Sequence, residues 1–457
     1  MHLDDTIVAI ATPPGSGGIG VVRLSGPEAT TIAKPMLRLP HDLQPNRALF
    51  GELIDPASND RIDEVVVTYF AKPHSYTTED IVEISCHGSP VVLRHVVELA
   101  LARGARLAEP GEFTMRAFLN GRIDLTQAEA VRDLIDSQTL YQAQVAARQL
   151  EGALSKRLQP IKQKLVDLIA IMEVGIDFAE DDVSVIPDWQ ILERIAEVHA
   201  LLEQLLASFA YGKVVHEGLT LAIVGRPNVG KSSLFNRLVE HERAIVTATP
   251  GTTRDLVTET VSIGGIPVRL VDTAGIRDAF DEAESIGVRK SMEALADADI
   301  VLVVLDASHP PSDEAARRRD TELVSQVARR SAIVVQNKID AISTAPLVPD
   351  GGLPVVMTSA KTGLGIDFLR AKILQLAGGD GATQPESGFL TNVRHQKLVQ
   401  DSLAALDAAT SAVPLKTPHE MILLDLYNAL RSLDEITGAT TADDILNLIF
   451  SAFCIGK

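Results

Sequence analysis

Nine residues that begin at Gly225, GRPNVGKSS, restrict the fold of this chain more than any other stretch. The apolar run LTLAIVG leads into them, and SLFNRLVE, whose apolar residues have helical spacing, follows. They fit the pattern G-x-x-x-x-G-K-[ST], in which glycines let backbone N–H groups turn inward around phosphate oxygens at the start of a helix. The stretch therefore predicts a P-loop between a buried strand and a helix.

The sequence around the P-loop indicates a parallel sheet wound by helices. Between residues 219 and 377, buried-strand runs alternate with helical stretches, which is typical of this architecture. The runs are LTLAIVG, VRLVDTAG, DIVLVVLD, SAIVVQNK and LPVVMTSA. With 457 residues the chain is too long for one hydrophobic core, since single cores stop growing at about 250 to 300 residues. Further domains are therefore expected on either side.

Three motifs at the ends of these strands identify the predicted base as guanine. DTAG, from Asp272 to Gly275, can hold magnesium through its carboxylate and meet the γ-phosphate through its glycine amide. In NKID, the Asp340 carboxylate can accept two hydrogen bonds from guanine N1 and N2, which adenine cannot offer. SAK, from Ser359 to Lys361, can present its backbone to the base oxygen. Order and spacing resemble those of the translation-factor-related GTPases.

The four motifs and the segment TATPGTTRD, residues 247–255, define the predicted GTP site. Lys231 would place a point charge at the terminal phosphates, and the hydroxyls of Ser232 and Thr253 would ligate magnesium. The residues predicted to contact the nucleotide are Asn228, Val229, Gly230, Lys231, Ser232, Ser233, Thr247, Thr249, Gly251, Thr252, Thr253, Asp272, Thr273, Ala274, Gly275, Asn337, Lys338, Asp340, Ser359, Ala360 and Lys361.

The position after DTAG departs from the small signalling GTPases. Ras-like proteins place a water-orienting glutamine there, whereas this chain has Ile276, whose apolar side chain cannot orient water. TATPGTTRD and Asn228 offer several neutral oxygens, which suit a monovalent cation that supplies the charge of an arginine finger. Asp281, Glu282 or Glu284 could orient the water, although a solvated face is the more common role of such an acidic cluster.

The sequence before the GTPase region reads as two different kinds of structure. Over residues 6–118, short apolar runs alternate with Gly, Pro and Ser, which is typical of an α+β unit. From there the period becomes helical, with a capping signal at Thr126 and Glu129. Amphipathic helices continue to about residue 210, and we expect breaks at Pro160 and Pro187.

Helical sequence returns after a Gly-rich linker that ends at Gly388. We therefore predict one all-α bundle into which the α/β P-loop GTPase domain is inserted. The predicted boundaries are 1–120 for the N-terminal domain, 121–215 with 380–457 for the helical domain, and 216–379 for the GTPase domain.

Charge and cysteine usage limit the compartment and the partners. The chain has 42 basic and 61 acidic side chains and a net charge of −19, so an RNA contact must be local or shared with a partner. No run of about 18 apolar residues is present that would span a bilayer. The first ten residues, MHLDDTIVAI, carry acids where a secretory signal needs positive charge, and two cysteines are too few for a disulfide framework. We expect a cytoplasmic protein with no membrane contact.

Two stretches near the N-terminus carry weaker signals. PPGSGGIG satisfies G-x-G-x-x-G, but GVVRLSG continues as β-branched strand sequence. We reject a dinucleotide-binding turn, because such a turn must open a helix. GEFTMRAFLNGRIDL, from Gly111, reads as a polar and basic bend between domains that could face an anionic ligand, and a structural turn is the simpler interpretation.

The whole chain resembles one family of GTPases. The segments DTIVAIATPPGSGGIG, SYTTEDIVEISCHGSP, PGEFTMRAFLNGRIDLTQAEAV, GRPNVGKSS and FCIGK are similar to those of the MnmE (TrmE) family of tRNA modification GTPases. The resemblance implies a folate-binding N-terminal domain like the tetrahydrofolate domain of the glycine cleavage system, a helical domain and an inserted G domain. It also implies a homodimer formed through the N-terminal domains.

The resemblance further implies a flavoprotein partner, MnmG, and tRNA as the substrate. Together the two proteins would add a carboxymethylaminomethyl or aminomethyl group to carbon 5 of the wobble uridine, uridine 34. The one-carbon donor would be a tetrahydrofolate in its 5-formyl or 5,10-methylene form. Potassium would let two G domains dimerise across the nucleotide.

The resemblance also assigns roles to single residues. Family members often have lysine where Arg122 stands, so the geometry of that contact would differ. The implied folate site comprises Arg23, Glu83, Arg122 and Lys457. The implied potassium ligands are Asn228, Thr247, Thr249 and Thr252, the magnesium ligands are Ser232 and Thr253, and Glu284 would position the hydrolytic water.

The tail FCIGK, residues 453–457, admits several interpretations. As a prenylation box it fails, because Gly456 is not aliphatic and Lys457 is not a usual last residue. A disulfide is disfavoured in the cytoplasm. We interpret the tail as a hook that delivers Cys454 and Lys457 to the folate pocket. The Cys454 thiol could add to the uridine base or be a bystander, and the sequence leaves both open.

The GTPase motifs taken alone fit a second function equally well. A ribosome-assembly or signalling GTPase, acting as a binding switch without modification chemistry, would carry the same four motifs. Binding of a reduced folate distinguishes the two functions.

Overall fold

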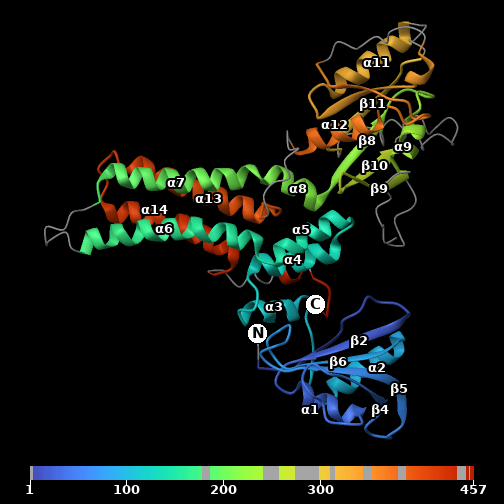
Figure 1. Ribbon diagram of the computed structural model, residues 1–457, viewed down its shortest axis with the longest axis vertical. Coiled ribbons are helices and arrows are strands. Elements are labelled where there is room, and N and C mark those ends of the chain that lie inside the picture. The colour runs from blue at the N-terminus through green and yellow to red at the C-terminus, as the bar shows by residue number, and fades with distance from the viewer. Residues whose placement is uncertain are drawn as a thin grey trace. The chain divides into compact units, whose positions relative to one another are not determined.

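The computed structural model of the chain forms two compact units (Figure 1). The first unit comprises Met1–Arg132, Gln149–Gly152 and Asp434–Lys457, and the second comprises Asp133–Arg148 and Ala153–Leu433. The three-domain boundaries given above remain a prediction. Over the described ranges, no helix has both the length and the apolar character needed to cross a bilayer. The structure describes residues 4–177, 186–239, 257–272, 298–308, 314–342, 352–378, 388–439, 449–451 and 453–456.

The first unit is built on a sheet with the strand order β3-β4-β5-β6-β2-β1-β7. All neighbouring strands are antiparallel except β1 and β7, which are parallel. Its elements are β1 (Ile7–Ile10), β2 (Gly17–Ser25), α1 (Ala29–Ala33), the 3-10 helix Lys34–Met36, β3 (Leu37–Arg38), β4 (Ala48–Ile54), β5 (Arg61–Phe70), β6 (Ile81–Gly88), α2 (Pro90–Leu101), β7 (Arg106–Leu107), α3 (Glu112–Leu119) and α4 (Leu125–Asp136).

Alternation along β2 and β6 separates a core face from an open face of this sheet. On β2, Val22 and Leu24 are fully buried in the core, to which α2 adds Leu93. Arg23 and Glu83 have the opposite phase, so their side chains lie on the other face. The prediction that GVVRLSG is a strand is thus confirmed. Because this segment continues as β2 and not as a helix, PPGSGGIG is not a dinucleotide-binding turn.

Two local expectations for residues 111–129 are wrong. The stretch after Gly111 is the helix α3 and not a bend, and its Glu112 and Arg116 are fully buried. The capping box of α4 is formed by Asp124 and Gln127 and not by Thr126 and Glu129. Asp124 Oδ1 accepts from the Gln127 backbone N–H at 2.9 Å, and Gln127 Oε1 accepts from the Asp124 N–H at 2.9 Å.

The second unit contains a helical bundle drawn from both sides of the α/β sequence. Helix α7 packs against α6, which precedes the sheet in the chain, and against α13, which follows it. This arrangement confirms the predicted insertion. The helices of this part are α5 (Leu140–Leu150), α6 (Ala153–Asp177), α7 (Asp188–Ala207), α8 (Phe209–Glu217), α13 (Val393–Ala412) and α14 (His419–Thr437).

Pro160 does not break the bundle as predicted, because it lies inside α6. A proline in a helix interior removes one backbone hydrogen bond and costs about 3 kcal/mol. Its neighbours Leu158, Ile161 and Leu165 are buried, and burial of such a side chain stabilises by about 1.5 to 3 kcal/mol each. Packing therefore outweighs the local cost. Pro187 behaves as predicted and stands at the N-cap of α7.

The α/β part of the second unit is a sheet with the strand order β13-β12-β11-β8-β10-β9. All neighbouring strands are parallel except the antiparallel pair β9 and β10, which confirms the predicted parallel sheet. Its elements are β8 (Leu219–Val224), α9 (Lys231–Val239), β9 (Val257–Ile263), β10 (Ile266–Asp272), β11 (Ile300–Asp306), α11 (Glu314–Val327), β12 (Ala332–Asn337), the 3-10 helix Ile339–Ala341, β13 (Val355–Met357) and α12 (Ile366–Gly378).

Candidate functional site

The predicted P-loop joins the carboxyl end of β8 to the start of α9. Asn228 and Gly230 adopt positive φ angles of 63° and 96°. These backbone conformations produce the tight turn of the loop. The Lys231 ammonium donates to the carbonyls of Gly225 at 2.9 Å and Arg226 at 2.8 Å. Ser232 and Ser233 are exposed in the first turn of α9, where a helix N-terminus favours anions.

Asn337 of NKID ties three of the predicted motifs together. Its Nδ2 donates to the Val229 carbonyl of the P-loop at 3.1 Å, and its Oδ1 accepts from the Ala360 N–H of SAK at 3.0 Å. Asn337 is almost fully buried, so both contacts are shielded from water. The structure thus brings the P-loop, NKID and SAK to one edge of the sheet, where parallel strands end.

Asp340 is held in place by the SAK motif. Its Oδ1 accepts from the Ser359 hydroxyl at 2.5 Å, and the Asp340 side chain is exposed at the edge of the sheet. Lys361 follows Ser359 and is exposed beside it. A carboxylate fixed on one oxygen keeps its orientation toward the base that it would recognise.

Sequence reasoning missed Asp306, the residue that positions Lys338. The Lys338 ammonium donates to Asp306 Oδ2 at 2.6 Å and to the Asn228 carbonyl at 2.6 Å, so it links β11 to the P-loop. Burial raises the pKa of Asp306, but hydrogen bonds from Lys338 and Ser308 outweigh it and hold the pKa below 3.8. The available signal was an acid at the end of the buried run DIVLVVLD, at the same sheet edge as the other motifs.

Two arginines of the same region were also missed. Arg237 on α9 donates to the carbonyls of Ala360 at 3.0 Å and Lys361 at 2.8 Å. These two hydrogen bonds tie the SAK loop to α9. Arg226 in the P-loop forms a two-pronged ion pair with Asp320 on α11, at 2.6 and 2.9 Å. Their partners are distant in sequence, and no local spacing predicts them.

Several predicted residues cannot be compared with the structure. Asp272 ends β10, in register with Ile223 of β8, so DTAG starts at the same edge as the P-loop. The predicted residues Thr247, Thr249, Gly251, Thr252, Thr253, Thr273, Ala274, Gly275, Glu284 and Lys457 lie outside the described residues.

A second cluster forms on the open face of the first unit's sheet. Arg23 and Glu83 are direct cross-strand partners in the β2–β6 register. Arg23 Nε and Nη2 contact Glu83 Oε1 at 2.8 and 2.7 Å. The strand register therefore brings together two of the residues that the family resemblance assigned to folate.

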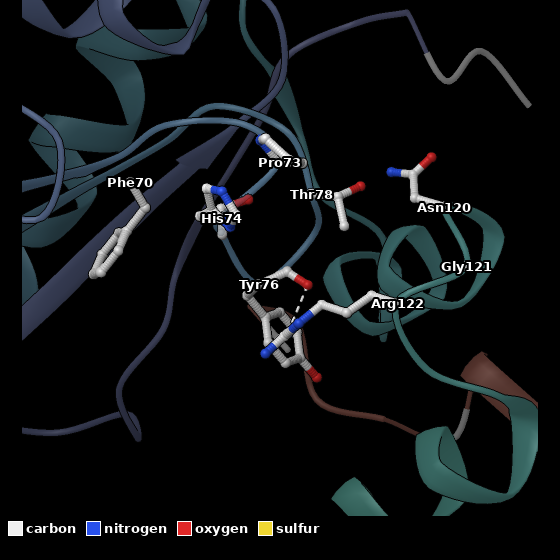
Figure 2. A pocket seen from close by; sticks show the side chains of 9 residues that line it. Phe70, Pro73, His74, Tyr76, Thr78, Asn120, Gly121 and Arg122 are labelled. Atoms are coloured by element: carbon white, nitrogen blue, oxygen red, sulfur yellow. Dashed lines mark hydrogen bonds between the residues drawn. The ribbon is translucent and has the colours of Figure 1, made fainter.

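The ring of Tyr76 lies against both arginines of the predicted folate site. The guanidinium carbon of Arg122 is 4.9 Å from its centroid, as Figure 2 shows, and that of Arg23 is 5.9 Å away. Both distances are within the range of cation–π interactions. Arg122 Nη1 also donates to the Tyr76 carbonyl at 2.8 Å, and the Tyr76 hydroxyl is 3.0 Å from Thr114 Oγ1. Sequence reasoning missed Tyr76, although its segment was among those that carry the resemblance.

The tail docks beside this cluster, and delivery of Cys454 and Lys457 to a folate pocket stays a prediction. The Cys454 carbonyl accepts from the Gly111 N–H at 3.4 Å, and Ile455 forms an antiparallel bridge with Pro110. The Gly456 carbonyl accepts from Arg23 Nη1 at 3.5 Å. The Cys454 thiol is free and its side chain is exposed, so a role in chemistry remains a proposal.

A buried ion network holds the segment that carries Tyr76. Arg116 is fully buried and pairs with Asp5 at 2.5 Å, Glu112 at 3.0 Å and Glu79 at 3.1 Å. Glu79 in turn accepts from the Ser25 hydroxyl at 2.7 Å. Since Glu79 lies three residues after Tyr76, the network anchors the loop that carries Tyr76.

Replacing Glu112 by glutamine should weaken this network in a pH-dependent way. Burial raises the pKa of Glu112, but hydrogen bonds from Arg106, the Glu109 N–H and Arg116 outweigh it and hold the pKa below 4.5. The contribution of the charge is therefore full above pH 4.5 and is lost as the pH falls through the folded-state pKa. Removing one partner of a buried pair costs about 3 to 5 kcal/mol. Hydrogen exchange of residues 106–119 at pH 7 should show faster opening in E112Q than in the wild type.

The same measurement at lower pH and on a control variant completes the test. The difference between wild type and E112Q should shrink below pH 4.5. Glu98→Gln, at a position 71% exposed on α2, should match the wild type at every pH. Equal protection of E112Q and wild type at pH 7 would refute the role given to the network.

Comparison with known proteins tests the family resemblance independently of this geometry. Residues 125–454 match the family model of the MnmE helical domain, and residues 6–122 match that of the GTP-binding protein TrmE N-terminus. The chain is 69% identical over 460 residues to the tRNA modification GTPase MnmE of Koribacter versatilis, with 100% of both chains covered. It is 43% identical over 466 residues to that of Alkaliphilus oremlandii, again with 100% of both covered. The same identity extends over 454 residues to that of Aquifex aeolicus, covering 99% of this chain and 100% of that protein. The chain therefore belongs to the MnmE (TrmE) family of tRNA modification GTPases.

Proposed function

We propose that this protein is the GTP-hydrolysing component of the system that modifies the wobble uridine of tRNA. Together with a flavoprotein of the MnmG type, it would add a carboxymethylaminomethyl or aminomethyl group to carbon 5 of uridine 34. A tetrahydrofolate would supply the one-carbon unit. The observation that carries this proposal is the position of the tail, where the Gly456 carbonyl accepts from Arg23, the partner of Glu83. The same chain brings the NKID and SAK motifs together at the edge of the second sheet.

The nucleotide half of the function follows from the loops at the sheet edge. Asp340 reads the guanine edge, and Lys231 can leave the loop carbonyls to meet the terminal phosphates. Ser232 and Thr253 would hold magnesium, which would supply positive charge that stabilises the phosphates. Asn228, whose side chain is exposed in the P-loop, would be one potassium ligand with Thr247, Thr249 and Thr252.

The residues of the second cluster fit a reduced folate. The edge of a pterin ring offers neighbouring N–H groups that a carboxylate can accept, as Asp340 does for guanine. Both contacts that Arg23 makes with Glu83 fall on Oε1, which leaves Oε2 to face a ligand. Arg122 and the tail with Lys457 would complete the folate site, and Cys454 would stand close to it.

An apolar surface of the first unit supports the proposed homodimer. On the open face of its sheet, Phe50 is 63% exposed and Val66 is 40% exposed, and Ile19 on β2 is 71% exposed. Side chains of this type are usually covered when they lie together on a sheet face. A second copy of the first unit would cover them in the dimer that the family forms.

The alternative is a ribosome-assembly or signalling GTPase without modification chemistry. Such a GTPase would use the whole nucleotide site. It would assign no function to the docked tail or to the cluster of Arg23, Glu83 and Tyr76. Binding of 5-formyltetrahydrofolate to the folded, GTP-binding chain separates the two functions. A chain that binds GTP but no reduced folate would favour the alternative.

The experiment that tests the proposed function is analysis of bulk tRNA by mass spectrometry. The tRNA would come from cells that lack this protein and from the same cells rescued with it. We expect loss of the carbon-5 group at uridine 34 without the protein and its return on rescue. Unchanged tRNA would overturn the proposal.

The proposed potassium site makes GTP hydrolysis dependent on the cation. The oxygen cage around the P-loop should fit potassium better than the smaller sodium ion, so the hydrolysis rate should be at least tenfold higher in potassium than in sodium at equal ionic strength. Steady-state phosphate release in the two salts measures this ratio. Equal rates in the two salts would show that the proposed potassium site does not contribute to hydrolysis.

Glu284→Ala should abolish most hydrolysis and leave GTP affinity nearly intact. A carboxylate that positions the attacking water contributes to the transition state and little to ground-state binding, so a loss of about 100-fold in kcat is expected. The control is Glu282→Ala in the same acidic stretch, which should hydrolyse GTP at the wild-type rate. If E284A keeps full activity, another group orients the water.

A further inference from the structure

The first unit contains a pocket of about 530 Å³ next to the proposed folate cluster (Figure 2). The loop before β6 supplies Pro73, His74, Tyr76 and Thr78, and the turn after α3 supplies Asn120 and Arg122. In Figure 2, Arg122 lies across the ring of Tyr76, and both residues line the pocket. Tyr76, which lines the pocket, is thus also the residue whose ring Arg23 contacts.

The chemistry of the lining favours a negatively charged ligand. None of the nine residues that form the wall, all of them described, carries a carboxylate, whereas Arg122 and His74 offer N–H donors and Thr78 a hydroxyl. The acids of the neighbouring loop are engaged elsewhere. Glu79 is bound by Arg116 and Ser25, and Asp80 accepts from the Tyr69 hydroxyl at 2.8 Å.

The exposure of the pocket favours a hydrated, charged group over a flat aromatic ring as its occupant. His74, Asn120 and Arg122 are all exposed, so the wall is open to water. An aromatic pterin gains from burial, whereas a hydrated carboxylate loses little when it binds at an open site. The Arg122 guanidinium, already fixed by the Tyr76 carbonyl, is suited to a forked contact with a carboxylate.

We propose that this pocket binds the γ-linked glutamate chain of a polyglutamylated tetrahydrofolate. The inference rests on the proposed function, because it takes the Arg23 and Glu83 cluster to hold the pterin end. A ligand held there passes Tyr76, and its carboxyl-bearing end reaches the pocket beside Arg122. The pocket would then select the polyglutamate form of the cofactor over the monoglutamate.

The test compares two ligands on the full-length protein. Binding of 5-formyltetrahydrofolate with one glutamate and with three γ-linked glutamates is measured by titration calorimetry at low and high salt. We expect the triglutamate to bind about tenfold more tightly at low salt, and this gain to shrink at high salt because the site is exposed. The monoglutamate arm reports on the proposed function, and the ratio of the two affinities reports on the pocket.

Substitutions of residues that line the pocket test which side chains cause the tighter binding of the triglutamate. Arg122→Gln and His74→Gln should each lower the affinity ratio toward one, even where R122Q also weakens the monoglutamate. The matched control is Arg94→Gln, an exposed arginine on α2 that contacts the Pro90 carbonyl. R94Q should keep the wild-type ratio, and retained monoglutamate binding shows that each variant is folded.

The outcomes separate the two proposals. If both ligands bind equally well to the wild type, the pocket does not hold the glutamate chain, while the folate assignment stands. If H74Q and R122Q weaken both ligands by the same factor, the pocket holds another part of the folate and the inference is overturned. If neither ligand binds, the folate-dependent function itself fails.

Discussion

Replacing Asp340 by asparagine should lower the affinity for GTP by about 100-fold or more and create affinity for xanthosine triphosphate. Guanine offers N–H groups at N1 and N2 to the carboxylate, and each hydrogen bond to a charged group contributes about 1.5 to 3 kcal/mol. Xanthine carries a carbonyl where guanine has its N2 amine, so the asparagine N–H₂ group can donate to it. The Ser359 hydroxyl, which donates to Asp340 Oδ1, can still hold the amide oxygen in place.

Competition of each nucleotide against a fluorescent analogue measures both affinities. Rescue by xanthosine triphosphate distinguishes a change of base specificity from a misfolded domain. Asp367→Asn, at a fully exposed position on α12, is the control and should bind GTP as the wild type does. If D340N binds GTP normally, the base is read by another group.

Gly456→Ala should detach the tail from the first unit and weaken binding of 5-formyltetrahydrofolate by at least tenfold. Gly456 has a φ of +99°, and a Cβ there would lie 2.2 Å from the Ile10 carbonyl oxygen, which belongs to the backbone and cannot move aside cheaply. Displacement of this residue removes the Gly456 carbonyl from Arg23. GTP affinity should not change, because the nucleotide loops lie in the second unit.

The chain offers a closely matched control for this substitution. Gly104 has the same φ of +99°, but a Cβ there meets nothing within 4 Å. Gly104→Ala therefore carries the same backbone strain without the clash, and it should bind the folate normally. Titration of both variants with the folate, beside a GTP titration, measures the effect. Full folate affinity in G456A would show that the tail is not part of the site.

The nucleotide edge could be predicted from the sequence because its motifs are local. The P-loop, NKID and SAK each follow a buried strand, and parallel strands end at one edge, so their meeting point is fixed by the fold. What could not be predicted is how Asn337 and Lys338 reach across to the P-loop carbonyls. These contacts depend on the spacing between strands that are distant in the sequence.

The cluster of the first unit was less accessible to sequence reasoning. Alternation places Arg23 and Glu83 on one face, but only the register of β2 against β6 makes them partners. Tyr76 lies in a loop without periodicity, and Arg116 looks like a surface residue until α3 is seen to be buried. Pro160 was misjudged for the same reason, since local propensity was outweighed by packing in α6.

The docked tail also sets the order in which the protein can be completed during synthesis. Ile455 pairs with Pro110, and Arg23 bonds to Gly456 across 433 residues of chain, a separation that encloses the whole second unit. Contacts of such sequence distance form late, because the loop between them must be closed first. The nascent first unit must therefore wait, with Arg23 already on its sheet face and Tyr76 in the loop before β6, while the ribosome makes the second unit. A nucleotide-binding domain would exist before the folate cluster is finished.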